Sequence, residues 1–138
     1  MFRKILIPVD FSEKNETALA SAVEIAGAGG TILLLHVIEE IEHLGRDEMA
    51  DFYHQLESRA QARLETMTKK LTASGVVVRH AILYGKRAEA IVRYADEQQV
   101  DLLLLSSHRV DRDHPALGWG TISYRIAIMA RCPVLLVK

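Results

Sequence analysis

Two short stretches of this sequence carry residue types suited to chemistry on a ligand. Gly120 and Thr121 precede residues 122–130, an apolar segment with helical spacing. A Gly-Thr pair at a helix start offers free backbone N–H groups, a hydroxyl and the positive end of the helix dipole, which together suit a phosphate. Asp10 follows an apolar run that contains Pro8. Its carboxylate either caps the next helix or contacts a ligand or metal ion.

A polar segment, residues 108–119, contains residue types that bind metals. His108, Asp111, Asp113 and His114 are ligands that zinc and other transition metals accept, and Asp10 is a further candidate. The same composition is typical of a solvated loop, so both interpretations stay open. Trp119, between two glycines, could stack on a base, cover a crevice or fill a dimer contact.

Catalytic arrangements are less evident than binding ones. Ser106, Ser107 and His108 place hydroxyls beside an imidazole, but adjacency in sequence does not create the geometry of a nucleophile and its base. Efficient catalysis is therefore not the favoured interpretation. His36 lies within an apolar strand and is expected to be a hydrogen-bonded core residue, and Cys132 is expected to pack rather than react.

Apolar runs and helical repeats alternate along the chain and would position these residues. Strands are expected at residues 2–10, 31–38, 76–83, 101–107 and 132–138. Helices are expected from Ser12, as N-cap, to residue 26, and at residues 49–72, 86–99 and 122–130. In the long second helix the predicted apolar stripe is formed by Phe52, Leu56, Ala60, Leu64, Met67 and Leu71, and in the last helix by Ile122, Ile126, Met129 and Ala130.

Strands that alternate with helices predict a parallel sheet. We expect one α/β domain, residues 1–138, with a doubly wound five-stranded sheet in the order 3-2-1-4-5 and helices on both faces. The third strand, with Arg79 and His80 among apolar residues, should lie at an edge. The first and fourth strands are then neighbours at the switch point, where Pro8 lacks a backbone donor and the strands should open into a crevice.

Length, charge and cysteine content restrict the possible partners. The 138 residues carry a formal net charge of −1, which gives no reason to expect nucleic acid as a partner. Apolar runs are too short to insert into a membrane. The single cysteine excludes an internal disulfide, and a cytoplasmic location is the default expectation.

Several short motifs in the same order make the chain resemble the universal stress protein family over its whole length. They are residues 4–12 (KILIPVDFS), 34–38 (LLHVI), 101–108 (DLLLLSSH), 120–121 (GT) and 132–137 (CPVLLV). The resemblance implies the adenine nucleotide alpha hydrolase-like fold and an ATP site. Pro8, Val9, Asp10 and Val37 would line the adenosine side, with Asp10 near the ribose, and Ser106, Ser107, His108, Arg109, Gly120, Thr121 and Ile122 the phosphate side, with Mg²⁺ if nucleotide binds.

The sequence departs from the family's glycine motif at two positions. Ser106 and Arg109 stand where glycines are expected, and ten residues separate Arg109 from Gly120. Glycine lets the backbone approach phosphate and adopt positive φ, which Arg109 does poorly. The Arg109 guanidinium could instead pair with phosphate, whereas Asp111 and Asp113 would repel it unless a cation intervenes.

Three functions follow as hypotheses from the resemblance and these departures. The first is a stress-response regulatory module that binds ATP or another adenine nucleotide between the first and fourth strands. The second is a member that has lost nucleotide binding and acts through dimerisation and protein partners. The third, a slow ATP hydrolase, lacks an evident general base. A homodimer through the C-terminal strand is implied by the resemblance, and the apolar edge at residues 134–137 agrees with it.

Overall fold

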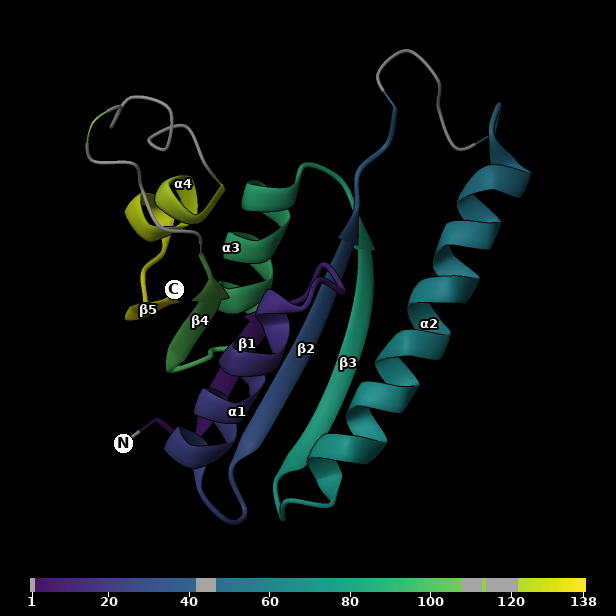
Figure 1. Cartoon of the computed structure of the whole chain (residues 1–138). Helices are drawn as coiled ribbons and strands as arrows, with labels where there is room; N and C mark the ends of the chain where they lie inside the picture. The colour runs from purple at the N-terminus through teal and green to yellow at the C-terminus, as the bar shows by residue number, and fades with distance from the viewer. Residues whose placement is uncertain (1, 42–46, 108–112, 114–121) are drawn as a thin grey trace.

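A computed structural model describes residues 2–41, 47–107, 113 and 122–138 of the chain. Strands and helices alternate along it, as Figure 1 shows. The elements are β1 (Lys4–Pro8), α1 (Lys14–Ala26), β2 (Thr31–Ile38), α2 (Ala50–Thr72), β3 (Val77–Tyr84), α3 (Arg87–Glu97), β4 (Leu102–Ser106), α4 (Ile122–Met129) and β5 (Val134–Val137). None of the helices in these described ranges is long and apolar enough to cross a membrane.

The five strands form one parallel sheet in the order β3-β2-β1-β4-β5. This is the predicted doubly wound topology, with β3 at an edge as its sequence indicated. Helices α1 and α2 pack on one face with Ile5 and Ile7 of β1, and α3 and α4 pack on the other face with Leu6. The central strands are buried on both faces, which explains why they read as continuous apolar runs rather than alternating ones.

Strand β1 pairs with its two neighbours over different lengths. It pairs with β2 as far as Pro8, which lies opposite Leu35, but with β4 only at Ile5 and Leu6. Pro8 has no backbone N–H to donate, so β1 and β4 separate toward their carboxyl ends. The predicted opening at the switch point is therefore present.

At the other end of the sheet, where the strands begin, hydrogen bonds join connecting segments that are far apart in the sequence. The Arg3 guanidinium donates to the carbonyls of Ala26 and Ala28 at 2.9 and 3.1 Å. The Asp101 carboxylate accepts the backbone N–H groups of Arg3 and Lys4, each at 3.1 Å. These bonds connect the chain before β1 to the turns that precede β2 and β4.

The start of α1 differs from the prediction that Ser12 caps it. The helix begins at Lys14, its cap position is Glu13, and no side chain bonds there to a helix N–H. The Ser12 amide instead donates to Asp10 Oδ1 at 2.9 Å, so the carboxylate of Asp10 forms a local turn before the helix.

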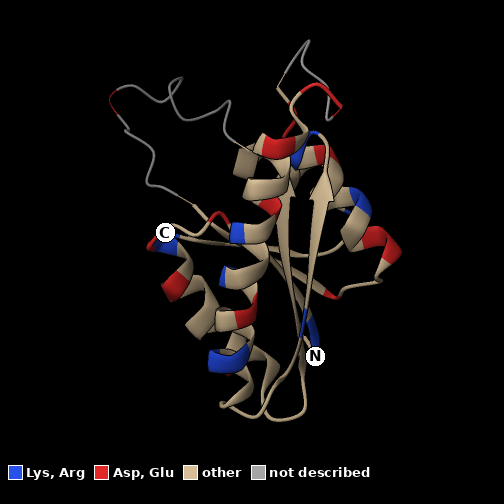
Figure 2. Ribbon diagram, turned by 90° about the vertical axis from the view of Figure 1, so that its right-hand side faces the viewer, with Lys and Arg blue, Asp and Glu red and all other residues tan. Residues whose placement is uncertain are grey.

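Two residues of the predicted apolar stripes, Phe52 and Met129, were wrongly assigned to the buried face. Phe52 is 42% exposed, and the adjacent Tyr53 is buried instead, with its hydroxyl accepting the Ile41 amide. Met129 at the end of α4 is exposed as well. The ring of Tyr53 can be buried because its hydroxyl has a backbone partner, a contact that the apolar spacing of the helix does not reveal. Both signs of charge occur along α2, as Figure 2 shows.

The connection between β1 and α1 is held by a buried side chain, Asn15, which is 3% exposed. Its Oδ1 accepts the backbone N–H groups of Asp10 and Phe11 at 3.1 and 3.0 Å, and its Nδ2 donates to Ser106 Oγ at 3.0 Å. Phe11 has a φ of 67°, a conformation that costs energy for a non-glycine residue. The amide of Asn15 thus stabilises a strained turn and ties it to the end of β4.

We predict that Asn15→Ala lowers the free energy of unfolding by about 2–4 kcal/mol, because it leaves buried donors and an acceptor without partners. Urea unfolding followed by circular dichroism measures the loss. Glu16→Ala, one residue along on the exposed side of the helix, is the control and should change stability little. Equal losses in the two variants would contradict the assigned role of Asn15.

Cys132, the residue expected to pack, is half-buried against the α3 and α4 side of the core. Burial raises the pKa of its thiol above the ordinary value, and the negative charges of Asp96 and Asp101 raise it further. We predict slow alkylation by iodoacetamide at pH 7, rising only at a higher pH than in the urea-unfolded chain, because the thiolate is the nucleophile. As Cys132 is the single cysteine, mass spectrometry of the intact chain gives both rates. Equal rates at every pH would contradict the prediction.

Candidate functional site

A cavity of about 230 Å³ lies at the carboxyl ends of β1 and β4, where these strands separate. Open α/β sheets bind their ligands at this position. The cavity, called the crevice below, brings together the predicted site residues Pro8, Val9, Asp10, Val37, Ser106 and Ile122. It also includes polar residues that the sequence did not single out as ligand contacts: Asn15, His36, Arg87 and Ser123.

The other predicted site residues do not line the crevice or fall outside the described part of the chain. Ser107 is buried, and its amide donates to the Val137 carbonyl at 2.7 Å, which directs it toward β5. The positions of His108, Arg109, Gly120 and Thr121 are outside the described residues. The predicted phosphate side is therefore represented here by Ser106 and Ile122 only.

Asp10 contributes an ionised carboxylate to the crevice. Burial opposes its ionisation, but hydrogen bonds from Ser12 and from its own amide, together with the positive charge of Arg87, hold the pKa below the ordinary value. The predicted cap is not formed, because no side chain bonds to a helix N–H at the start of α1 and Asp10 Oδ1 accepts the Ser12 amide in the turn before the helix. The exposed carboxylate lies at the crevice, where the predicted ligand contact requires it. At neutral pH it can accept hydrogen bonds from hydroxyl groups.

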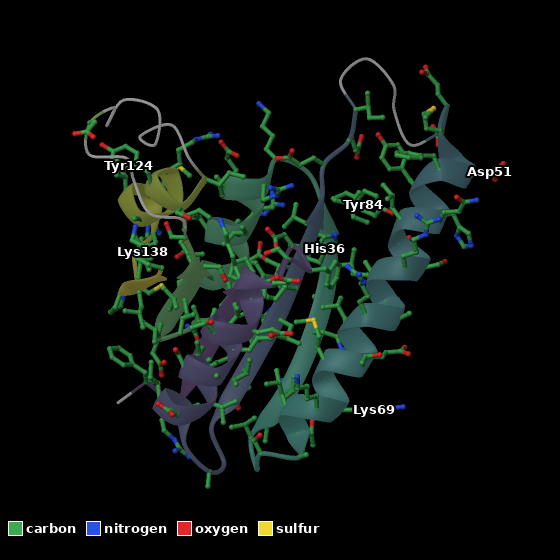
Figure 3. The ribbon with its side chains drawn as sticks, viewed as in Figure 1. His36, Asp51, Lys69, Tyr84, Tyr124 and Lys138 are labelled. Atoms are coloured by element: carbon green, nitrogen blue, oxygen red, sulfur yellow. The ribbon has the colours of Figure 1, made fainter. Side chains whose placement is uncertain are left out.

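His36 lines the crevice, and Figure 3 shows it near the start of α1. Its Nδ1 donates to the Val9 carbonyl at 2.8 Å, and the Phe11 ring lies against it with centroids 4.5 Å apart. The predicted hydrogen bond of His36 is confirmed, but the residue is half-buried and lines the crevice instead of lying wholly in the core. Because His36 also lines the crevice, its imidazole is a surface that a bound ligand would touch.

Arg87 is the cation of the crevice, and the sequence analysis missed it. It is the first residue of α3, and its backbone N–H donates to Glu39 Oε1 at 3.1 Å. A positive side chain at the amino end of a helix is unfavourable toward the helix dipole. An arginine at the unfavourable end of a helix, just after the carboxyl end of a strand, is the sequence feature that could have identified Arg87 as a crevice residue.

The hydroxyl of Ser106, at the first altered glycine position, is used within the protein. It accepts Asn15 Nδ2 and donates to the Lys14 carbonyl at 3.3 Å. The Ser106 carbonyl accepts the hydroxyl of Ser123 at 3.4 Å. Ser106 therefore joins β4 to the starts of α1 and α4, so its hydroxyl is not paired with a catalytic base among the described residues.

A metal site is not formed by the described residues, since no three of their histidine, cysteine and carboxylate side chains are grouped closely enough to hold an ion. Of the predicted ligands, Asp10 lies in the crevice and Asp113 is exposed and does not line it, whereas His108, Asp111 and His114 are outside the described residues. The crevice as described offers an anion, a cation, an imidazole and apolar walls. Such a set suits recognition of a polar small molecule.

Known proteins resemble this chain along its whole length. The family model described as "Universal stress protein family" matches residues 1–138. Universal stress protein MJ0577 of Methanocaldococcus jannaschii is 30% identical, with 100% of this chain and 96% of that protein covered. The solved structure of MJ0577 has a TM-score of 0.83 over 100% of this chain and 96% of that chain.

More distant solved structures share the fold. A universal stress protein in complex with cAMP has a TM-score of 0.74 at 19% identity, covering 99% of this chain and 96% of that one. A universal stress protein from Archaeoglobus fulgidus in complex with dAMP has a TM-score of 0.66 at 16% identity and covers both chains fully. With the match of the family model to residues 1–138 and the parallel sheet of order 3-2-1-4-5, the chain belongs to the universal stress protein family.

Proposed function

We propose that this protein is a cytoplasmic regulatory binding module whose crevice takes an adenine nucleotide. The observation that carries the proposal is the cavity itself: Val9, Asp10 and Val37 line one pocket with Ser106 and Ile122. These residues come from the ends of β1, β2, β4 and the start of α4. A nucleoside there would meet apolar walls for the base and the Asp10 carboxylate for the ribose hydroxyls.

The charges of the crevice give this proposal its chemistry. Asp10 is ionised and Arg87 lies near enough to lower its pKa. Arg87 can donate to acceptors on a base or phosphate. Arg109 would add a second guanidinium on the phosphate side, and Mg²⁺ would offset the nearby carboxylates. That relatives of the same fold were solved with cAMP and dAMP supports an adenine nucleotide as the class of ligand.

The alternative is a module that does not bind nucleotide and acts through protein contacts. It is favoured by the commitment of the Ser106 hydroxyl to Asn15 and Lys14, since this hydroxyl is then less available to a phosphate. Hydrolysis of ATP is not proposed, because the sequence offers no evident general base.

We predict that nucleotide-stripped protein melts at a higher temperature when ATP and Mg²⁺ are added. Ligand at a hundred times its Kd stabilises a protein by about 2.7 kcal/mol. Asp10→Asn should weaken binding by about tenfold to a hundredfold, because hydrogen bonds to charged groups contribute about 1.5–3 kcal/mol. Titration calorimetry with ATP, with and without Mg²⁺, measures both effects.

Asp51→Asn is the matched control, since Asp51 is an exposed carboxylate in the first turn of α2 that points away from the rest of the molecule, as Figure 3 shows. It should bind ATP as the unaltered chain does. If millimolar ATP changes neither heat nor melting temperature, the nucleotide proposal fails and the protein-contact alternative replaces it.

We also propose a homodimer through β5, which is an edge strand of the sheet. Leu135 of β5 is 39% exposed, and Ile128 and Met129 of the preceding helix are exposed at 65% and 38%. An apolar edge strand invites pairing with another strand. A second copy of this chain would cover these side chains.

We predict that Leu135→Lys converts the dimer to a single chain, because pairing would bury the new charge. Light scattering after size exclusion measures the mass in solution. Val77→Lys is the matched control, since Val77 is equally an exposed residue, at 48%, on the other edge strand, β3. A monomeric unaltered chain would refute the dimer, and dissociation by Val77→Lys alone would assign it to the wrong edge.

A further inference from the structure

A second and larger cavity, called the groove below, lies between α1 and α2 on the face of the sheet that these helices cover. Its volume is about 770 Å³, within the range typical of small-molecule sites. Phe11, Leu19 and Val23 from the α1 side and Met67 and Leu71 from α2 give it an apolar lining. The groove is a different cavity from the crevice, to which the nucleotide proposal applies.

The walls of the groove are joined by a contact at one end and by a hydrogen bond just beyond the other. At one end the Arg63 guanidinium of α2 lies 5.2 Å from the centre of the Phe11 ring. Just beyond the other end, the Gly29 amide donates to the Gly75 carbonyl at 3.0 Å, which joins the turns that follow α1 and α2. Between Glu16 and Glu24 the α1 wall extends about 12 Å at 1.5 Å per residue. A bounded, elongated space of this kind suits a slender molecule.

The apolar lining is sunk rather than projecting. Leu19, Val23 and Met67 are half-buried and Leu71 is buried. The strongly exposed apolar side chains of the described chain, such as Ile128 and Phe52, lie elsewhere. A partner helix would need an open-ended trough to receive its side chains. Flexible hydrocarbon needs only a narrow apolar slot, so an alkyl chain is the better match.

The two rims of the groove carry opposite charge. Glu16 and Glu24 line the α1 side, and Arg63 and Lys70 line the α2 side, each pair spaced by about two helical turns. Within the described residues none of these four forms an ion pair. Arg63 faces the Phe11 ring, so Lys70 is the cation more available to a ligand. The carboxylates of α1 repel an anion, which confines a negative head group to the α2 rim.

We propose that the groove binds a single-chain fatty acid. The alkyl chain lies against Leu19, Val23, Met67 and Leu71, and the carboxylate lies at Lys70. The chain's burial supplies most of the affinity, because apolar surface leaves water. The head group fixes the orientation through its charge.

Dodecanoate, kept below its micelle concentration, is the probe for this proposal. Calorimetry should show one dodecanoate molecule bound per chain. In a separate fluorescence titration, dodecanoate should displace a neutral naphthylamine fluorophore from the same site. Dodecanol, which has the same chain and no charge, should bind more weakly, because it lacks the carboxylate that Lys70 attracts. Equal binding of the two amphiphiles, or no heat with dodecanoate, would overturn the proposal.

Charge reversal tests the position of the head group. Lys70→Glu should weaken dodecanoate by about threefold to tenfold, the scale of a solvent-exposed ion pair that becomes repulsive. Lys69→Glu makes the same charge change at a neighbouring residue that lies outside the groove and points away from the molecule, as Figure 3 shows. Equal effects of the two variants would assign the interaction to net charge and contradict the proposed site.

Filling the groove tests the position of the chain. Ala62→Trp places an indole into the groove from an exposed helix position and should abolish dodecanoate binding. Ala50→Trp, at an exposed alanine of the same helix outside the groove, should leave it unchanged. Melting temperatures confirm that both variants fold. Unchanged binding in folded Ala62→Trp would refute the groove as the site.

Discussion

The amide of Asn15 holds together the region in which the crevice lies. It accepts two backbone N–H groups of the turn after β1 and donates to Ser106 at the end of β4. Without this amide, two donors and one acceptor would be left at a point where β1 and β4 no longer pair. Because an amide both donates and accepts, neither an aspartate nor a leucine of similar size reproduces these bonds. The geometry of the crevice therefore depends on a residue whose contacts are mostly internal.

Charge in the crevice is balanced by placement rather than by direct pairing. Arg87 begins a helix against the helix dipole, and its positive charge contributes to the lowered pKa of Asp10. Among the described residues, the crevice therefore holds one ionised acceptor, Asp10, and one permanently charged donor, Arg87, at neutral pH. A ligand with hydroxyls at one position and acceptors at another satisfies both groups without displacing either.

Sequence pattern was sufficient for the fold because each strand has a distinctive composition. Apolar runs such as residues 31–38 indicated burial on both faces, and alternation with helices indicated parallel pairing, which together leave few topologies. Asp10 and Ser106 could be placed in one crevice from that topology alone, whereas Val37 was expected there from the family resemblance. Asn15 and Arg87 could not, because their roles depend on side-chain hydrogen bonds and charge across elements. Tyr53 replaced Phe52 in the core for the same reason, since its hydroxyl has a backbone partner.

The hydrogen bonds from Arg3 and Asp101 have a consequence for how the molecule opens locally. They join the beginnings of the strands through turns that are far apart in sequence, whereas β1 and β4 separate at their carboxyl ends. Local opening of a protein requires less free energy where few such bonds must break. Amide protons near the strand starts should therefore exchange with solvent mainly when the whole domain unfolds, and those around the crevice through smaller fluctuations. The sheet thus has one stable end, where the strands begin, which preserves the fold. Its other end, at the crevice, opens more readily and can adjust to a ligand.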